Sequence, residues 1–290
     1  MKTADSLSSQ ALADLLWVLG TPALACGDNV VAPMQLDVGS VDVEHLEDFI
    51  SKRPDRRVGH YFETLILYWL THIVKVELIA NGQQIMDGKR TVGELDFLFR
   101  DRDGVLNHWE AAVKFFLHYP RQGESHFPGP NARDNFERKT DQLFGKQLRL
   151  GALHFPDVQI RKAFVRGRIF SRRNQAEPTE LPTRMNPGCL KGKWLRRSEL
   201  AELQEVYDSL LGHIVAKPLW LAPVFEPQLV SVERVCTTLK SHFEEADQPR
   251  MISMRDADGS ELQRVFVVSD NWPTVDKSKL AQGAKGVGAS

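Results

Sequence analysis

The chain has 290 residues, of which 42% are hydrophobic and 26% are charged, and its formal net charge is −1. A chain of this length buries enough apolar surface to fold without disulfides or structural metals, and its three cysteines form no CxxC pair. The near-zero charge excludes a global basic field that would attract nucleic acid, so any such binding must be local.

The first part of the chain predicts helices followed by a strand. Apolar residues recur with helical spacing over residues 5–19 and 43–52. Residues 57–73, RVGHYFETLILYWLTHI, are apolar and aromatic on most faces, which is typical of a helix buried in a core. Residues 74–80 then predict a strand, and Asn81-Gly82 predicts a turn.

Two further strands, joined by a polar turn, are predicted over residues 94–100 and 105–117. In the second, strand alternation puts one set of side chains on one face, Trp109, Ala111, Val113 and Phe115, and the other set on the opposite face, His108, Glu110, Ala112 and Lys114. One face is therefore apolar and suited to a core, while the other presents a carboxylate and an ammonium.

The rest of the chain alternates loops, helices and strands. The Pro- and Gly-rich residues 118–131 predict a loop, and the segment 171–192, rich in Pro, Arg and Asn, marks a boundary. The remaining predicted elements are a helix over 135–149, a strand over 158–169, helices over 198–213 and 231–245, and a hairpin over 251–269.

The sequence thus predicts an α/β fold in which helices flank a mixed central sheet, with a C-terminal α+β extension. We expect an N-terminal core over residues 1–170 and a C-terminal α+β region packed on it over 171–273. Residues 274–290 contain almost no large apolar side chains, which predicts a disordered tail.

Several functional classes lack their sequence signals. No apolar run reaches the roughly 18 residues of a membrane span, and the first residues do not resemble a secretory signal, so we expect a cytoplasmic protein without membrane contact. No P-loop or GxGxxG is present, so no nucleotide cofactor is expected. The histidines show no HxH or HExxH spacing, and we expect none of them to bind a metal.

Acidic residues of the predicted hairpin point to a metal site. Metal-dependent phosphodiester cleavage uses two or three carboxylates to hold Mg²⁺ or Mn²⁺ and a lysine to stabilise charge. Asp96 and Glu110 lie on adjacent predicted strands, and Lys114 shares a face with Glu110. The alternative is that the two carboxylates are ordinary hairpin surface charges, with Lys114 as their structural partner.

The segment GELDFLFRDRDGVLNHWEAAVK resembles the core of PD-(D/E)XK nucleases, in which an Asp on one strand precedes a Glu-x-Lys on the next. The resemblance implies a restriction-endonuclease-like core in which Asp96 and Glu110 are metal ligands and Lys114 is the catalytic lysine. It also implies that Glu63, in the preceding helix, is an auxiliary ligand and that Gln147 lies near the site.

This resemblance covers roughly residues 57–150. A wider stretch, including RVGHYFE, GPNARD, LWLAP and FVVSDNWP, resembles an uncharacterised bacterial domain-of-unknown-function family assigned to the same superfamily. Simpler interpretations stay open for two residues. Glu63 could lie at a helix edge or pair with an arginine, and Gln147 could be an ordinary polar position of a helix.

One departure from the nuclease pattern concerns the lysine. The spacing here is Glu110-x-x-x-Lys114, about 13 Å along an ideal strand instead of about 7 Å for Glu-x-Lys, and Ala112 occupies the expected lysine position. A bulge, or a lysine that reaches back along the strand, would restore the geometry. A site that has lost its activity would show the same spacing.

Basic residues gather in the middle third of the chain, among them Arg133, Lys139, Lys146 and Arg166. The first three are predicted to contact a phosphate backbone, together with Gln147. Two functions therefore stay open. One is a divergent Mg²⁺- or Mn²⁺-dependent nuclease acting on nucleic acid. The other is an inactive nuclease-fold protein that binds nucleic acid, or binds a protein through the C-terminal region.

Overall fold

The structure is a computed structural model that describes residues 9–274, so the predicted tail lies, except for Thr274, outside the described residues. The helical elements are α1 (Gln10–Gly20), η2 (Val38–Ser40), α2 (Val43–Ser51), α3 (Val58–Tyr68), η3 (Trp69–Val74), α4 (Phe136–Gln142), η4 (Leu143–Gln147), α5 (Leu148–His154), η5 (Arg197–Glu199), α6 (Leu200–Val206) and α7 (Val232–Glu245). The strands are β1 (Glu77–Asp87), β2 (Arg90–Arg100), β3 (Leu106–Leu117), β4 (Tyr119–Arg121), β5 (Glu124–His126), β6 (Ile160–Arg172), β7 (Leu190–Arg196), β8 (Leu211–Val215), β9 (Val230–Ser231), β10 (Arg250–Arg255) and β11 (Glu261–Val268).

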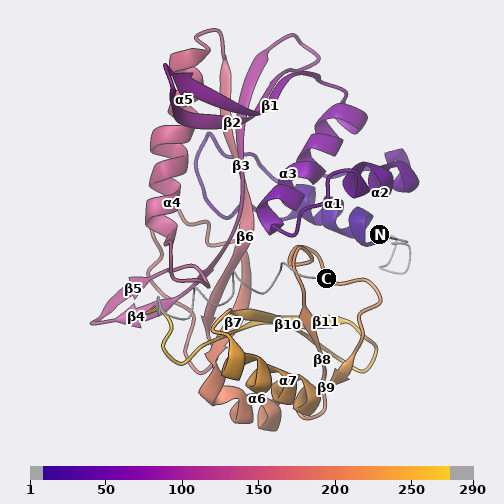
Figure 1. Cartoon of the computed structure of the whole chain (residues 1–290), viewed down its shortest axis with the longest axis vertical. Coiled ribbons are helices and arrows are strands. Elements are labelled where there is room, and N and C mark those ends of the chain that lie inside the picture. Colours follow the sequence, from indigo (N-terminus) through magenta and orange to yellow (C-terminus); the bar gives the residue numbers. More distant parts are fainter. Residues whose placement is uncertain (1–8, 275–290) are drawn as a thin grey trace.

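A nine-stranded mixed sheet runs the length of the molecule (Figure 1) in the order β1-β2-β3-β6-β7-β11-β10-β8-β9. Its central strands β3, β6, β7 and β11 are parallel to one another. Antiparallel strands complete the sheet on both sides of them. This architecture confirms the predicted α/β fold with a mixed central sheet flanked by helices and a C-terminal strand region.

Helices cover both faces of the upper part of the sheet. Figure 1 shows α1, α2 and α3 on one side of β3 and β6, and α4 and α5 on the other side. On the first side Phe62 of α3 meets Phe164 of β6 edge to face, with ring centroids 5.8 Å apart. On the second side Phe136 of α4 meets Phe116 of β3 in the same way, at 5.6 Å. Each face of β3 and β6 therefore has its own apolar core.

The predicted buried helix over residues 57–73 is confirmed as α3 followed by the π-helical segment η3. Phe62, Leu65 and Ile66 are fully buried, and burial of such a side chain contributes about 1.5–3 kcal/mol to folding. The helix ends at Lys75, whose φ of 60° places it in the left-handed region. That turn directs the chain into β1 at the edge of the sheet.

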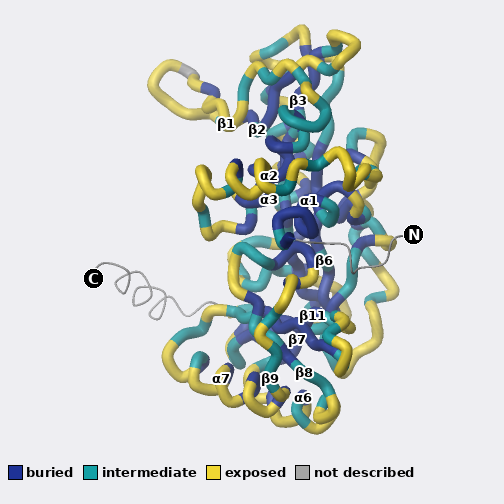
Figure 2. Tube along the Cα trace, turned by 90° about the vertical axis from the view of Figure 1, so that its right-hand side faces the viewer, coloured by how far each residue is buried: buried dark blue, intermediate teal, exposed yellow. Residues whose placement is uncertain are grey.

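The C-terminal region extends the same sheet. Its helices α6 and α7 pack on β10 and β11 through a third apolar cluster. The predicted helix over residues 231–245 and the hairpin over 251–269 are confirmed, and the Ser231 hydroxyl caps α7 by accepting from the Arg234 N–H at 3.3 Å. Figure 2 shows that buried residues concentrate along β6, β7 and β11 and that exposed residues lie on the outer helices and loops.

Residues on both sides of the predicted boundary at 171 belong to one sheet and one core. Strand β6 crosses this position, and Phe62 and Trp194 are members of the same apolar cluster. Among the described residues, no helix is long and apolar enough to cross a membrane.

Two local predictions are wrong. Strand β1 continues through Asn81-Gly82, where Gly82 has a φ of 61° while Asn81 and Gln83 on either side stay paired with β2. The chain reverses direction after Asp87 instead. The predicted helix over residues 198–213 is also too long, because its last residues join β8, which pairs with β10.

Candidate active site

Asp96 lies where β2 and β3 separate. The two strands pair from Arg100–Leu106 to Phe97–Trp109, and their pairing ends before Asp96. Beyond that point the Ala111 N–H of β3 donates to Oδ2 of Asp96 at 2.7 Å. The Asp96 carboxylate therefore accepts from a β3 backbone N–H that is no longer paired with the backbone of β2. This hydrogen bond fixes the carboxylate between the two strands.

Glu110 projects from β3 on the face predicted by strand alternation, and its side chain is fully buried. Its Oε1 lies 2.7 Å from Nε2 of His108, two residues earlier on the same face. Its Oε2 accepts from Nε2 of Gln147 in η4 at 2.9 Å. A strand residue and a helix residue thus hold the second carboxylate in a single orientation.

Glu63 comes from the opposite layer, on α3. Its side chain is 37% exposed, and Oε2 lies 3.8 Å from Nδ1 of His60. Among the described residues no arginine forms an ion pair with it, so Glu63 lies at the helix edge and is not half of a buried Arg pair.

Asp96 and Glu63 line a cavity of about 190 Å³, which we call the acidic cavity. Its polar lining includes Glu63, Asp96, Lys114, Lys139 and Gln147. Apolar side chains complete the wall, and Glu110 lies directly behind it through its bond to Gln147. The structure therefore brings five predicted site residues and Glu110 to one place.

Burial raises the pKa of all three carboxyl groups. The pKa of Asp96 rises to about 7, because burial and then the charge of Glu110 oppose its ionisation. Burial also raises the pKa of Glu110 to about 8, against the effect of its hydrogen bonds with Asp96. Burial, and then the charges of Asp96 and Glu94, raise the pKa of Glu63 to about 7. At neutral pH the group therefore holds protons that a cation could replace.

Burial lowers the pKa of Lys114, and the neighbouring ammonium of Lys139 lowers it further. Among the described residues no hydrogen bond or ion pair engages the Lys114 ammonium. Its charge and that of Glu63 favour each other's ionised form. The cavity therefore combines carboxyl groups whose ionisation is opposed by burial with a lysine whose ammonium forms no ion pair among the described residues.

The donor set beside the acidic cavity limits how a divalent metal could bind. Within residues 9–274, no group of three or more His, Cys, Asp or Glu side chains is placed to hold a metal ion. Mg²⁺, however, commonly binds through one or two carboxylates and keeps several waters. Asp96 and Glu110 supply that chemistry, and the charge of Glu110 already opposes ionisation of Asp96. The residues present therefore fit a hydrated cation but not an all-protein cage.

The predicted basic residues lie at different places. Lys139 lines the acidic cavity and is 3.6 Å from Oδ2 of Asp134. Arg133 and Lys146 are exposed and do not line it. Arg166, by contrast, is fully buried and donates to the carbonyl oxygens of core residues. Only the first three stay candidates for contact with a phosphate backbone.

The sequence interpretation assigned no site role to His108. This residue is fully buried and holds Glu110, while its Nδ1 has no hydrogen-bond partner. Burial lowers the pKa of His108 to about 4, so its ring is neutral at physiological pH. Its position two residues from Glu110 on the same strand face was the signal that could have identified it.

Comparison with known proteins gives a family. The family model described as Domain of unknown function (DUF1853) matches residues 13–268, so the chain belongs to this family. Comparison with curated proteins and with solved structures found no match. The site itself must therefore support any functional conclusion.

Proposed function

We propose that this member of the DUF1853 family is a divergent metal-dependent nuclease that hydrolyses phosphodiester bonds of nucleic acid. The observation that carries the proposal is the meeting of Asp96 and Glu110 at the separation of β2 and β3, beside a cavity that contains two lysines. Buried carboxyl groups with strongly raised pKa values are typical of functional sites.

In this proposal Asp96 and Glu110 hold Mg²⁺ or Mn²⁺, and Glu63 is an auxiliary ligand from α3. When bound, the cation supplies positive charge at the phosphate and lowers the pKa of a water molecule. Gln147 and His108 orient Glu110. The amide of Gln147 donates to one carboxylate oxygen, and the His108 ring forms a hydrogen bond with the other. Such supporting contacts fix the direction of a ligand carboxylate.

The lysines would bind the substrate. Lys114 has no competing partner among the described residues, so its ammonium is free to stabilise charge on the phosphate. Lys139 lines the same cavity and would contact a neighbouring phosphate. Arg133 and Lys146 are exposed and would add contacts to the backbone that carry no sequence information.

A non-catalytic role is the second candidate, and two observations favour it. Ala112 lines the cavity where the nuclease pattern has a lysine. Both oxygens of Glu110 already have protein partners, so a metal must share them. In this case the protein keeps the fold and binds nucleic acid, or binds a protein partner through its C-terminal region.

Titration calorimetry with Mn²⁺ tests the proposal on wild type, Asp96→Asn, Glu110→Gln and the control Glu244→Gln. Glu244 is exposed on α7 and does not line the acidic cavity. We expect binding by wild type and control that is lost in both site variants, together with Mn²⁺-dependent cleavage of labelled DNA or RNA that follows the same pattern. Folded wild type that binds no Mn²⁺ would contradict the nuclease proposal. Nucleic-acid binding without cleavage would support the second candidate.

A further inference from the structure

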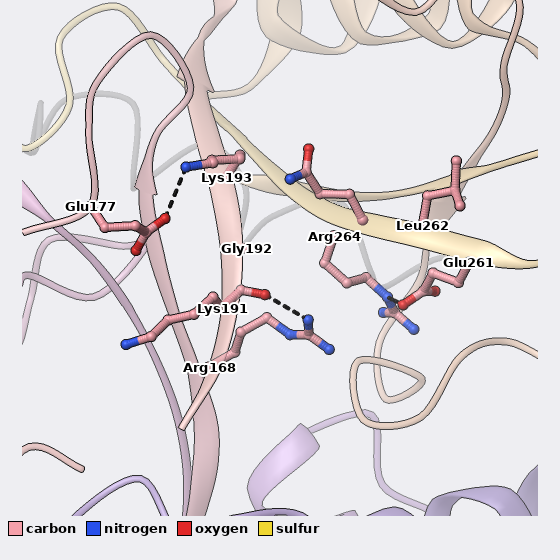
Figure 3. A pocket seen from close by; sticks show the side chains of 9 residues that line it. Arg168, Glu177, Lys191, Gly192, Lys193, Glu261, Leu262 and Arg264 are labelled. Carbon is pink, nitrogen blue, oxygen red and sulfur yellow. Dashed lines mark hydrogen bonds and ion pairs between the residues drawn. The ribbon is translucent and has the colours of Figure 1, made fainter. Parts of the chain in front are cut away.

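A second polar pocket, of about 320 Å³, opens where β7 and β11 separate. The two strands pair in parallel from Lys193–Val265 onward, and the residues before this pair line the pocket. It shares no lining residue with the acidic cavity. Figure 3 shows Lys193 and Glu177 on one side of this pocket, Glu261 and Arg264 on the other, and the Arg168 guanidinium directed towards β11.

The two carboxylates of the pocket are already engaged. Oε1 of Glu177 accepts from Nζ of Lys193 at 2.9 Å and from the Ser171 hydroxyl at 2.5 Å. Oε1 of Glu261 accepts from Nε of Arg264 at 2.6 Å, and its Oε2 accepts from the Ser253 hydroxyl at 2.6 Å. These contacts pair Lys193 with Glu177 and Arg264 with Glu261, and neither carboxylate forms an ion pair with the other two cations of the pocket.

Two cations, Arg168 and Lys191, therefore form no ion pair with an acidic side chain of the described residues. Arg168 uses Nη1 to donate to the Lys191 carbonyl at 2.8 Å, and its other N–H groups make no hydrogen bond there. The Lys191 ammonium contacts only Sγ of Cys189, at 3.7 Å. Both residues line the pocket, whose four cationic and two carboxylate side chains leave an excess of two positive charges.

An unbalanced guanidinium is costly in this position. Burial and then the charge of Arg264 lower the pKa of Arg168 to about 10, although the charge of Glu261 partly opposes this. A bound anion would offset that cost, because a guanidinium presents paired N–H donors that match two oxygens of a phosphate. A phosphate monoester also carries a charge of about −1.5 to −2 at pH 7, which matches the two unbalanced cations.

We propose that the pocket between β7 and β11 binds a phosphoryl dianion, with Arg168 and Lys191 as its charge partners. The ligand is either free phosphate or the phosphate of a small monoester. Arg168 binds it from β6 and Lys191 from the start of β7. This site is independent of the proposed nuclease activity, because none of its residues contributes to the acidic cavity.

The test is titration calorimetry of the full chain at constant ionic strength. The probes are inorganic phosphate, deoxyadenosine monophosphate and phosphate-free deoxyadenosine. The variants are Arg168→Gln, Lys191→Gln and the control Lys240→Gln, whose lysine is exposed on α7. Thermal melting followed by circular dichroism reports whether each variant is folded.

We expect wild type and control to bind phosphate and each pocket variant to bind about tenfold more weakly, which is the effect of losing one charge-assisted hydrogen bond. Tighter binding of the nucleotide than of phosphate, with no binding of deoxyadenosine, would identify a monoester site, and equal binding would identify a phosphate site. Arg168 also bonds the backbone of β7, so Lys191→Gln carries the test if Arg168→Gln does not fold. No phosphate binding by wild type, or equal binding by wild type and folded Lys191→Gln, would overturn the proposal.

Discussion

The raised pKa of Asp96 makes the stability of the metal-free protein depend on pH in a specific direction. The pKa rises from 3.8 to about 7 on folding. The folded state therefore holds the proton more tightly, and this contribution to stability is full below pH 3.8 and is lost as the pH rises through 7. At about 1.36 kcal/mol per pKa unit, the total is about 4 kcal/mol, of which about 2 kcal/mol is lost between pH 5 and pH 7.

The variant Asp96→Asn should remove this dependence while keeping the oxygen that accepts from the Ala111 N–H. In urea titrations with a chelator, we expect its free energy of unfolding to exceed that of wild type at pH 8. The difference should grow by about 3 kcal/mol between pH 5 and pH 8. Asp141→Asn, which removes an exposed carboxylate from α4, controls for the loss of a negative charge.

A constant difference across this range, or a variant that is less stable than wild type at pH 8, would refute the reasoning about Asp96.

A second measurement separates the effect of the metal from that of the Asp96 carboxylate. At pH 8, Mg²⁺ at 100 times its dissociation constant should stabilise wild type by about 2.7 kcal/mol and leave Asp96→Asn unchanged. Equal response of the two proteins would contradict the metal site but not the pKa of Asp96.

Three further predictions concern the surroundings of the site. Gly167→Ala should destabilise the protein by about 2–4 kcal/mol in urea titrations, because Gly167 has a φ of 153° and a Cβ there would overlap the β3 backbone, whereas Gly59→Ala has open space. His108→Phe should weaken Mn²⁺ binding at least about tenfold in calorimetry, since it removes a partner of Glu110, and unchanged affinity would contradict this role. Lys139→Gln should reduce the slope of log affinity for DNA against log salt by about 0.7–0.9, and an unchanged slope would show that Lys139 contacts no phosphate.

The residue pattern of β3 predicted both its existence and its two faces. The period of two in a strand depends only on backbone geometry, so Ala111 and Val113 could be assigned to a core and Glu110 to the opposite face before any partner was known. The structure confirms this, since Ala111 and Val113 belong to the cluster beneath α3. Local rules also identified α3, because its residues are apolar on most faces and must be buried.

Long-range contacts explain the errors. Residues 211–215 form β8 because Gly212 pairs with Met254 of β10, and no local pattern reports a partner so distant in the chain. Arg166 was counted with the basic residues of the middle third, yet it donates to the carbonyl oxygens of Val18 and Val31. From sequence alone, a charged residue is assigned to the surface, because the backbone groups that could bind it in the core are not known.

The site was only partly visible for the same reason. The hairpin placed Asp96 and Glu110 on neighbouring strands, which the structure confirms. That the strands separate at Asp96, so that its carboxylate binds the Ala111 N–H, depends on where pairing ends. The support of Glu110 by Gln147 likewise requires η4 to return to β3, which a sequence separation of 37 positions does not reveal.

The spacing from Glu110 to Lys114 keeps the lysine away from the strand carboxylate. Strand β3 pairs with β6 residue by residue from Asn107 to Leu117, so no bulge shortens the distance of about 13 Å along the strand. Lys114 instead shares its strand face with Ala112 and Phe116, which pack in the apolar cluster that contains Phe136 of α4. After burial, the charges of Lys139, Asp134 and then Glu63 act on its pKa. If the protein cleaves nucleic acid, its lysine therefore stabilises the phosphate without pairing with Glu110, which relies on His108 and Gln147 for its orientation.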